Sequence, residues 1–214
     1  MTEKKLIILA GISAILFVVM SLLVHFQQVG GFDLWATKEV QNTIGVEWAV
    51  PMSLLSLLGS VEITGLILLG ILFAKLRFNL MPIAVVLFLF AAPIGIEIVG
   101  KNVLVHPGPP DEFHRFSLPF YFPSRYVQTK YAFPSGHMLR TTFLAVLAAF
   151  LIQQSKLKSK SLYLGACFLV LATMALSRVY LGEHWASDVI GGILLGTAFS
   201  AMSGMYLDAQ SKKE

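Results

Sequence analysis

The chain has 214 residues, of which 56% are hydrophobic and only 13% are charged, and its formal net charge is +4. Soluble domains carry about a quarter charged residues, so this composition excludes an ordinary soluble protein and indicates an integral membrane protein. The basic residues are scattered between apolar runs, which excludes nucleic acid as an expected partner. We expect a single domain over residues 1–214, because the apolar runs leave no room for a separate soluble domain.

Six apolar stretches approach the roughly 20 residues that a bilayer-spanning helix needs. They are Leu6–Phe26, Val50–Ala74, Leu80–Gly100, His137–Ile152, Leu162–Leu181 and Trp185–Leu207. The expected fold class is therefore an all-α membrane protein with six transmembrane helices. Between the first two stretches, Gln27–Ala49 mixes charged residues with tryptophans. This mixture predicts a short amphipathic helix lying on the membrane surface.

The connections between the stretches predict how the protein is oriented. The N-terminal lysines, the segments Lys75–Arg77 and Ser155–Lys160, and the C-terminal lysines hold more than half of all Lys and Arg. Because such segments remain on the cytoplasmic side, both termini are expected inside, in a multi-pass protein of the plasma (inner) membrane. The long segment Lys101–Gly136, between the third and fourth helices, is then extracytoplasmic. It is rich in proline and aromatic residues.

Charged residues inside a membrane are costly and usually functional, so those near the helix ends are candidate site residues. Lys101 closes the third stretch, and Glu97 precedes it by four residues, which is the spacing of an ion pair that holds the lysine in place. The alternative is a lysine that extends to the membrane interface. Glu62 is a second intramembrane carboxylate, for which the sequence suggests no partner and no role.

The tetrapeptide Pro134-Ser135-Gly136-His137 opens the fourth stretch. Ser135 is a good N-cap residue, and Gly136 allows the backbone to approach a ligand closely. The free N–H groups of a helix start, together with the helix dipole, favour a bound anion, which His137 in the first turn would contact. The alternative is a simple capped helix start.

The segment Ser177–Asp188 combines an arginine, a histidine and an aspartate. Arg178 ends the fifth stretch and offers a planar fork suited to phosphate oxygens, although an interfacial arginine is the alternative. His184 and Asp188 are four residues apart and share one face if they are helical. The aspartate then orients the imidazole as a nucleophile or base, and a capping pair is the alternative.

These motifs carry a resemblance to a known family. Ser177-Arg178, five residues, His184, three residues and Asp188 resemble the third signature of the type-2 phosphatidic-acid phosphatase superfamily, and the tetrapeptide at 134–137 resembles the second. In the first signature, a lysine is followed by six residues and then Arg-Pro. Lys101 and Pro109 fit this pattern, but Gly108 stands where the family has arginine. The candidates to replace that arginine are Arg115, Arg125, Lys130 and Arg140.

The resemblance implies a lipid phosphatase without metal or other cofactor. It acts on a phosphate ester or diphosphate of a membrane lipid within the bilayer, such as a polyprenyl diphosphate (undecaprenyl diphosphate among them), phosphatidylglycerophosphate or phosphatidic acid. The absence of a metal also agrees with the single carboxylate, Asp188, since a magnesium site uses several. The sequence does not predict the oligomeric state.

The resemblance also assigns roles to the site residues. His184 attacks phosphorus and forms a phosphohistidine, Asp188 stabilises its positive charge, and His137 protonates the leaving oxygen and then activates water. The residues that bind the phosphate are Lys101, Ser135, Gly136 and Arg178.

Two other functions compete with this interpretation. A zinc hydrolase would bind its metal through His137, His184 and Asp188, although neighbouring cations would repel the metal. A small transporter or lipid-moving protein would have no hydrolase activity. Activity that survives EDTA excludes the first, and phosphate release from lipids excludes the second.

Overall fold

A computed structural model describes residues 2–76, 79–116, 118–120, 122–123 and 129–212. These residues are mostly α-helical, as expected. The α-helices are α1 (Glu3–His25), α2 (Gly30–Thr43), α3 (Ala49–Leu57), α4 (Val61–Leu76), α5 (Leu80–Val103), α6 (Gly136–Gln154), α7 (Lys160–Tyr180) and α8 (Ala186–Ser211), and the two short 3-10 helices are η1 (Val46–Trp48) and η2 (Asp111–Phe113).

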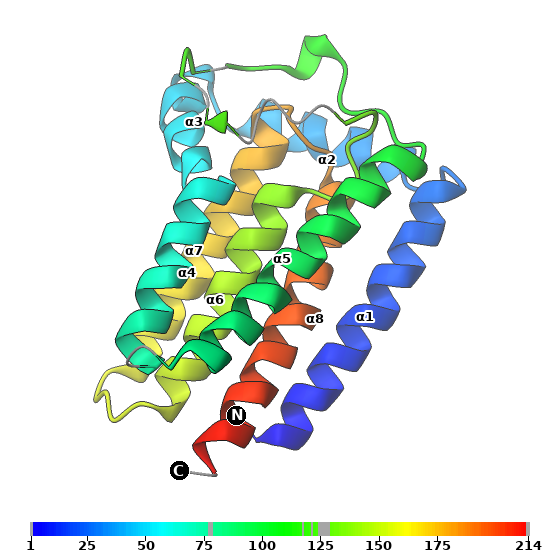
Figure 1. The fold of residues 1–214 in the computed structure, drawn as a ribbon. Helices are drawn as coiled ribbons and strands as arrows, with labels where there is room; N and C mark the ends of the chain where they lie inside the picture. Colours follow the sequence, from blue (N-terminus) through cyan, green and yellow to red (C-terminus); the bar gives the residue numbers. More distant parts are fainter. Residues whose placement is uncertain (1, 77–78, 117, 121, 124–128, 213–214) are drawn as a thin grey trace.

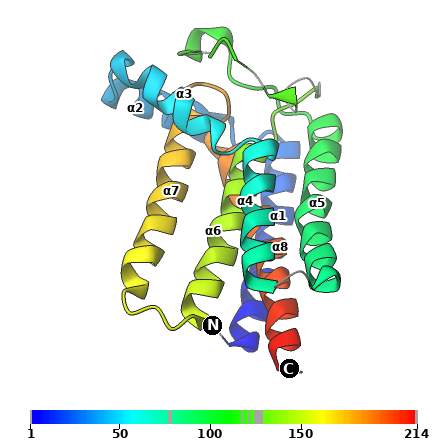
Figure 2. The ribbon, with the colours of Figure 1, turned by 60° about the vertical axis from the view of Figure 1, so that its left-hand side comes forward.

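The long helices run side by side as a bundle (Figure 1). Both termini lie at one end, which we call the terminal end, together with the connections α4–α5 and α6–α7. Helices α2 and α3 and the long segment between α5 and α6 lie at the other end, the loop end. Figure 2 shows the same division from the side. The helix predicted within residues 27–49 is thus confirmed as α2, which lies across the ends of the long helices.

Five of the described helices are long and apolar enough to cross a membrane: α1, α5, α6, α7 and α8. The second predicted stretch, Val50–Ala74, is not one continuous helix. It is divided into α3 and α4, which are bent by 49° and count as a sixth span only if the pair is taken as one. The break falls at Gly59 and Ser60, where the Ser60 hydroxyl caps α4 by accepting a hydrogen bond from Ile63 N at 3.3 Å.

Helix α8 packs closely against α6 because it carries glycines where the two backbones meet. A Cβ atom at Gly192 would lie 2.5 Å from the carbonyl oxygen of Ser135, and one at Gly196 would overlap the carbonyl oxygen of Leu139. Small residues of this kind let membrane helices approach to backbone contact. The first turn of α6 is therefore fixed against the first turns of α8.

Large apolar side chains cover much of the outer surface of the long helices. Examples that are more than half exposed are Ile15, Leu66, Phe88, Leu162 and Phe168. In water such a surface would be unstable, whereas lipid chains solvate it. The inner core, around Phe90, Phe143 and Phe150, is fully covered by the helices. The chain is a multi-pass membrane protein.

Hydrogen bonds hold the segments of the loop end together. The two ends of the α5–α6 segment pair with each other, since Tyr131 N donates to Lys101 O and Ala132 N donates to His106 O, both at 2.9 Å. The side chain of Gln41, on α2, donates to Phe113 O at 2.7 Å and to the last residue of α7 at 2.9 Å. The described parts of this segment therefore stay close to the helix ends that carry the predicted site.

Candidate active site

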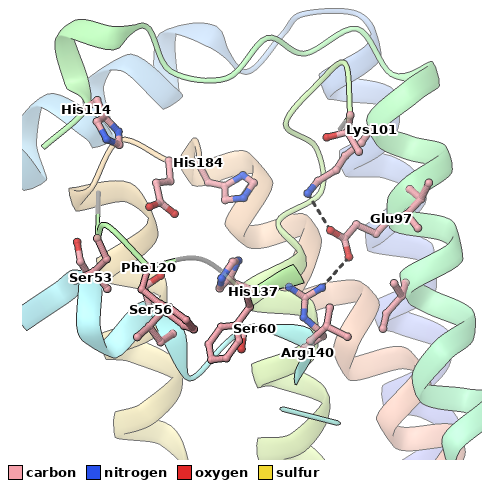
Figure 3. Close-up of a pocket in the computed structure, with 18 residues that line it drawn as sticks. Ser53, Ser56, Ser60, Glu97, Lys101, His114, Phe120, His137, Arg140 and His184 are labelled. Atoms are coloured by element: carbon pink, nitrogen blue, oxygen red, sulfur yellow. Dashed lines mark hydrogen bonds and ion pairs between the residues drawn. The ribbon is translucent and has the colours of Figure 1, made fainter. Parts of the chain in front are cut away.

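A cavity of about 450 Å³ opens at the loop end, between the α3–α4 pair, α5, α6 and the α7–α8 connection. Three of the predicted site residues line it: Lys101, His137 and His184. Figure 3 shows both imidazoles and the lysine ammonium on its wall. The two histidines, which are 47 positions apart, thus face the same space, as the phosphatase hypothesis requires.

His184 is held by Asp188, as predicted, but at a helix entrance and not on a helical face. The Nδ1 atom of His184 lies 3.2 Å from Asp188 Oδ2. Helix α8 begins at Ala186, with Trp185 as its N-cap, and the same carboxylate oxygen accepts a hydrogen bond from Trp185 N at 3.0 Å. The aspartate therefore caps the helix and fixes the imidazole at the same time, which leaves Nε2 available for chemistry.

The surroundings of His184 keep its imidazole neutral. Burial lowers the pKa of His184 to about 3, and the positive charges of Lys101 and Arg178 act in the same direction. Near neutral pH the ring is therefore unprotonated. A neutral ring has the lone pair that a nucleophile needs.

Behind Asp188 lies a buried polar network that the sequence analysis missed. His106 Nε2 lies 3.5 Å from Asp188 Oδ1, 3.5 Å from Asp33 Oδ2 and 3.1 Å from Ser187 Oγ. Ser187 donates its N–H and its hydroxyl to Asp33 at 2.8 and 2.7 Å. Burial raises the pKa of the Asp33 carboxyl. No spacing rule links α2 to α8, so the sequence held no signal for this network.

The start of α6 has the predicted N-cap residue without the predicted cap bond. Ser135 occupies the N-cap position, but its hydroxyl is fully buried and makes no hydrogen bond to any residue that the structure describes. Its N–H donates to Asp188 O at 2.9 Å, which ties α6 to α8. A Cβ atom at Gly136 would overlap the carboxylate of Glu97. Neither Ser135 nor Gly136 is among the residues that line the cavity.

Two cations on the cavity wall share one carboxylate. Lys101 Nζ lies 2.9 Å from Glu97 Oε1, which confirms the predicted ion pair, and Arg140 Nη1 lies 3.2 Å from Glu97 Oε2. Arg140 Nε also donates to Gly59 O at 3.1 Å, within the break between α3 and α4. The charge of Glu62 acts on the same guanidinium, which gives this carboxylate a neighbour that the sequence did not suggest.

Arg178 lies close to both histidines, on which its charge acts, but it is not among the residues that line the cavity. Its side chain is fully buried and forms an ion pair with Glu183, which lines the cavity beside His184. Its carbonyl oxygen accepts hydrogen bonds from the backbone N–H groups of Glu183 and His184. In this structure Arg178 therefore braces the α7–α8 connection, and its guanidinium lies behind Glu183.

Comparison with known proteins identifies the family of this chain. A model of the PAP2 superfamily matches residues 82–210, which include every predicted site residue. The chain belongs to the PAP2 superfamily.

Two similar proteins are also found, both from Bacillus subtilis. Phosphatidylglycerophosphatase B of strain 168 is 33% identical over 72 residues, which are 32% of this chain and 36% of that protein. The chain thus matches only about a third of the length of this relative. The crystal structure of a transmembrane PAP2-type phosphatidylglycerolphosphate phosphatase has a TM-score of 0.74 and 18% identity. That alignment covers 94% of this chain and 96% of the other, so the two proteins share a fold.

The arginine of the first PAP2 signature is absent from this chain. The four candidates to replace it lie in different places. Arg115 points away from the cavity, because it donates to Gln41 O at 2.9 Å and lies 5.7 Å from the centre of the Tyr180 ring. Lys130 lines a neighbouring cavity of about 300 Å³ together with Lys101, Gly108 and His184. Arg140 lines the main cavity. Arg125 lies outside the described residues.

The described side chains also bear on the zinc alternative. Among them, no group of three or more His, Cys, Asp or Glu residues is arranged to hold a metal ion. A zinc site would need His137, His184 and Asp188 to converge on one point. The side chain of Asp188 instead lies behind the imidazole of His184, bonded to Nδ1.

Proposed function

We propose that this PAP2 protein is a metal-independent phosphatase of membrane lipid phosphates that works through a phosphohistidine at His184. One observation carries the proposal. A neutral histidine fixed by a buried aspartate shares a cavity with a second histidine, His137, and with two cations, Lys101 and Arg140. This set supplies a nucleophile, an acid–base group and positive charge for a phosphoryl group.

The first chemical step transfers the phosphoryl group to the enzyme. His184 Nε2 attacks phosphorus in line, and the bond from phosphorus to the ester or bridging oxygen breaks. His137 donates a proton to the leaving oxygen, which departs as an alcohol or as a lipid monophosphate. Asp188 stabilises the positive charge that develops on the imidazole of His184.

The second step hydrolyses the phosphohistidine. His137, now without its proton, takes one from a water molecule, which attacks phosphorus and breaks the bond to Nε2. Inorganic phosphate leaves, and both histidines return to their starting states. In both steps Lys101 stabilises charge on the equatorial oxygens, and Ser135 and Gly136 join it if the start of α6 opens to the phosphate. Arg178 joins them if Glu183 gives way to the phosphate.

The proposed substrate is a lipid because of where the cavity lies. Its wall combines the polar groups above with apolar residues of the α3–α4 pair and α5, among them Leu57, Val61, Ile94 and Ile98. A headgroup can reach the histidines while its chains stay against apolar surface. Phosphatidylglycerophosphate, a polyprenyl diphosphate and phosphatidic acid all meet this requirement. The name of the Bacillus relative makes the first of them the first to assay.

The decisive experiment measures phosphate release by the purified full-length protein from a panel of lipid phosphates. We expect release in the presence of EDTA, and we expect His184→Ala to lose it while the thermal unfolding curve is retained. Brief reaction with radiolabelled substrate should leave acid-labile, base-stable label on the wild type alone. If the wild type releases no phosphate from any headgroup, the transporter becomes the better hypothesis, and near-normal activity of His184→Ala refutes the nucleophile.

We further propose that the loop end, and hence the active site, faces the extracytoplasmic side of the plasma membrane. The described basic residues Lys4, Lys75, Lys158 and Lys212 all belong to the terminal end, which supports a cytoplasmic position for that end (Figure 1). Lys38→Cys, on α2, should react with a membrane-impermeant maleimide in intact cells, and Lys158→Cys should react only after lysis. The reverse pattern would overturn the orientation.

A further inference from the structure

We propose that Arg140 supplies the phosphate-binding charge that Gly108 lacks, and that Glu97 joins Arg140 and Lys101 into one two-cation clamp for the phosphoryl group. This inference rests on the proposed function, because it assigns a residue to the same site. It assigns to α6 a role that the PAP2 pattern gives to the segment after α5.

The position of Arg140 suits this role. It follows His137 by three residues on α6, so the two side chains lie on neighbouring positions of one helix face, and both line the cavity. In Figure 3 the guanidinium lies beside the imidazole of His137, and Glu97 stands between Arg140 and Lys101. A phosphoryl group on His184 would therefore meet Lys101 and Arg140 as a pair.

The bonding of Arg140 leaves part of its guanidinium available. The residue is only 5% exposed, and a buried arginine is costly unless it is paired. Its Nη1 pairs with Glu97 and its Nε with Gly59 O, whereas Nη2 makes no hydrogen bond to any residue that the structure describes. Such a fork, held at two points, can give the remaining donor to a phosphate oxygen without losing its position.

The charges of this group also favour a phosphate. Glu62 is a further carboxylate near Arg140, but Lys101 and Arg140 contribute two positive charges and Glu97 one negative charge, so these three side chains carry one net positive charge. Without Arg140 the remaining pair would be neutral. The Arg178–Glu183 pair, on the other side of His184, is neutral already.

The structure also shows that the arginine of the PAP2 pattern could be put back. A Cβ atom at Gly108 would have Ala132 Cβ, at 3.8 Å, as its nearest neighbour, which is ordinary contact. Gly108 lines the smaller cavity together with Lys101 and His184, so an arginine at this position can reach the same phosphoryl group from the other side. If Arg140 replaces that arginine, an arginine at position 108 should compensate for the loss of the one at position 140.

The experiment compares Arg140→Gln, Gly108→Arg and their double variant with Arg115→Gln as the matched control, because Arg115 lines neither cavity. The readouts are kcat/KM on a lipid phosphate and the vanadate concentration that halves activity. A charge-assisted hydrogen bond is worth about 1.5–3 kcal/mol, so Arg140→Gln should weaken both readouts by about 10- to 100-fold. Arg115→Gln should change them by less than about threefold. The double variant should recover at least about tenfold over Arg140→Gln.

Two outcomes would overturn the inference: a folded Arg140→Gln that keeps vanadate affinity, or a double variant that regains nothing. The second outcome is expected if Arg140 only braces Glu97 and Gly59. If Arg140→Gln does not fold, Arg140→Lys keeps a charge but loses the fork, and Gly108→Arg should then rescue that variant. If the wild type proves inactive, the proposed function fails, and the thermal shift produced by vanadate in the same variants still tests the clamp.

Discussion

The two walls of the cavity are built in different ways. On one side, α6 and α8 meet backbone to backbone at Gly192 and Gly196, and Ser135 N–H donates to Asp188 O. On the other side, the bent α3–α4 pair and α5 reach α6 through side chains, by way of Glu97, Arg140 and the carbonyl of Gly59. His137, His184 and Asp188 belong to the first wall or to its entrance, whereas Lys101 belongs to the second.

This difference explains which parts of the PAP2 pattern can change. Backbone contacts between α6 and α8 hold the helix starts that carry His137 and Asp188 close together. A positive charge acts over a longer distance, so it can approach a phosphate from several directions. In the proposed clamp, the charge that is absent at Gly108 is supplied from α6 by Arg140.

The largest effect is expected from His137, the proposed acid–base group, which lies on the wall formed by α6 and α8. His137→Ala should lower kcat on a lipid phosphate by about 10²–10⁴-fold, because a poor leaving group needs the proton. With p-nitrophenyl phosphate, whose leaving group needs no proton, the loss should be clearly smaller. Steady-state rates on both substrates check this. Equal losses on the two would assign His137 to binding and not to proton transfer.

A smaller effect is expected from the network behind Asp188. His106→Gln removes an imidazole whose Nε2 lies 3.5 Å from the carboxylates of Asp33 and Asp188, and loss of a partner of a buried polar group costs about 1–3 kcal/mol. We expect kcat to fall by about 10- to 100-fold, with a shifted pH–rate profile and little change in KM. His25→Gln, at the exposed end of α1, is the control. A fall in thermal stability with an unchanged pH profile would make His106 purely structural.

Helix packing on the same wall can be tested through stability alone. Gly192→Ala places a Cβ atom against Ser135 O and Met138 Cβ, and overpacking of this kind costs about 1–3 kcal/mol. Its thermal midpoint should fall by several degrees. Gly165→Ala, on α7, has nothing within 4 Å of the new atom and should be neutral or stabilising. Equal midpoints for the two variants would show that α6 and α8 do not need backbone contact.

The smallest effect concerns acid stability. Because burial lowers the pKa of His184 to about 3 from the ordinary value of 6.5, the unfolded chain binds a proton that the folded chain does not between these values. Wild-type stability should therefore fall as pH drops below about 6.5, by about 1 kcal/mol per pH unit more than that of His184→Gln. Unfolding curves at pH 7.5, 6 and 5 check this. Parallel losses in both proteins would contradict a neutral His184.

The sequence predicted the members of the site better than their arrangement. Apolar length located the helices, and motif spacing selected Lys101, His137 and His184, which all line one cavity. The break at Gly59 was missed because its flanks are as apolar as an unbroken span. The ion pair of Arg178 with Glu183 was not predicted, because it depends on the turn that follows α7.

The sequence could not show which other segments contribute residues to the candidate site. Asp33 is 155 positions from Asp188 along the chain, and only the packing of α2 over the helix ends brings them together through His106. Arg140 was one of four possible replacements for the missing arginine. Only its bonds to Glu97 and Gly59 distinguish it from Arg115, which binds Gln41.

Two backbone hydrogen bonds, from Tyr131 to Lys101 and from Ala132 to His106, hold the two ends of the α5–α6 segment together. The described residues between them also contact the α7–α8 connection, because Trp185 Nε1 donates to Pro107 O at 2.8 Å and Arg115 N donates to Leu181 O at 3.2 Å. Under the proposed function, exchanging this stretch between relatives therefore tests whether it sets the headgroup preference.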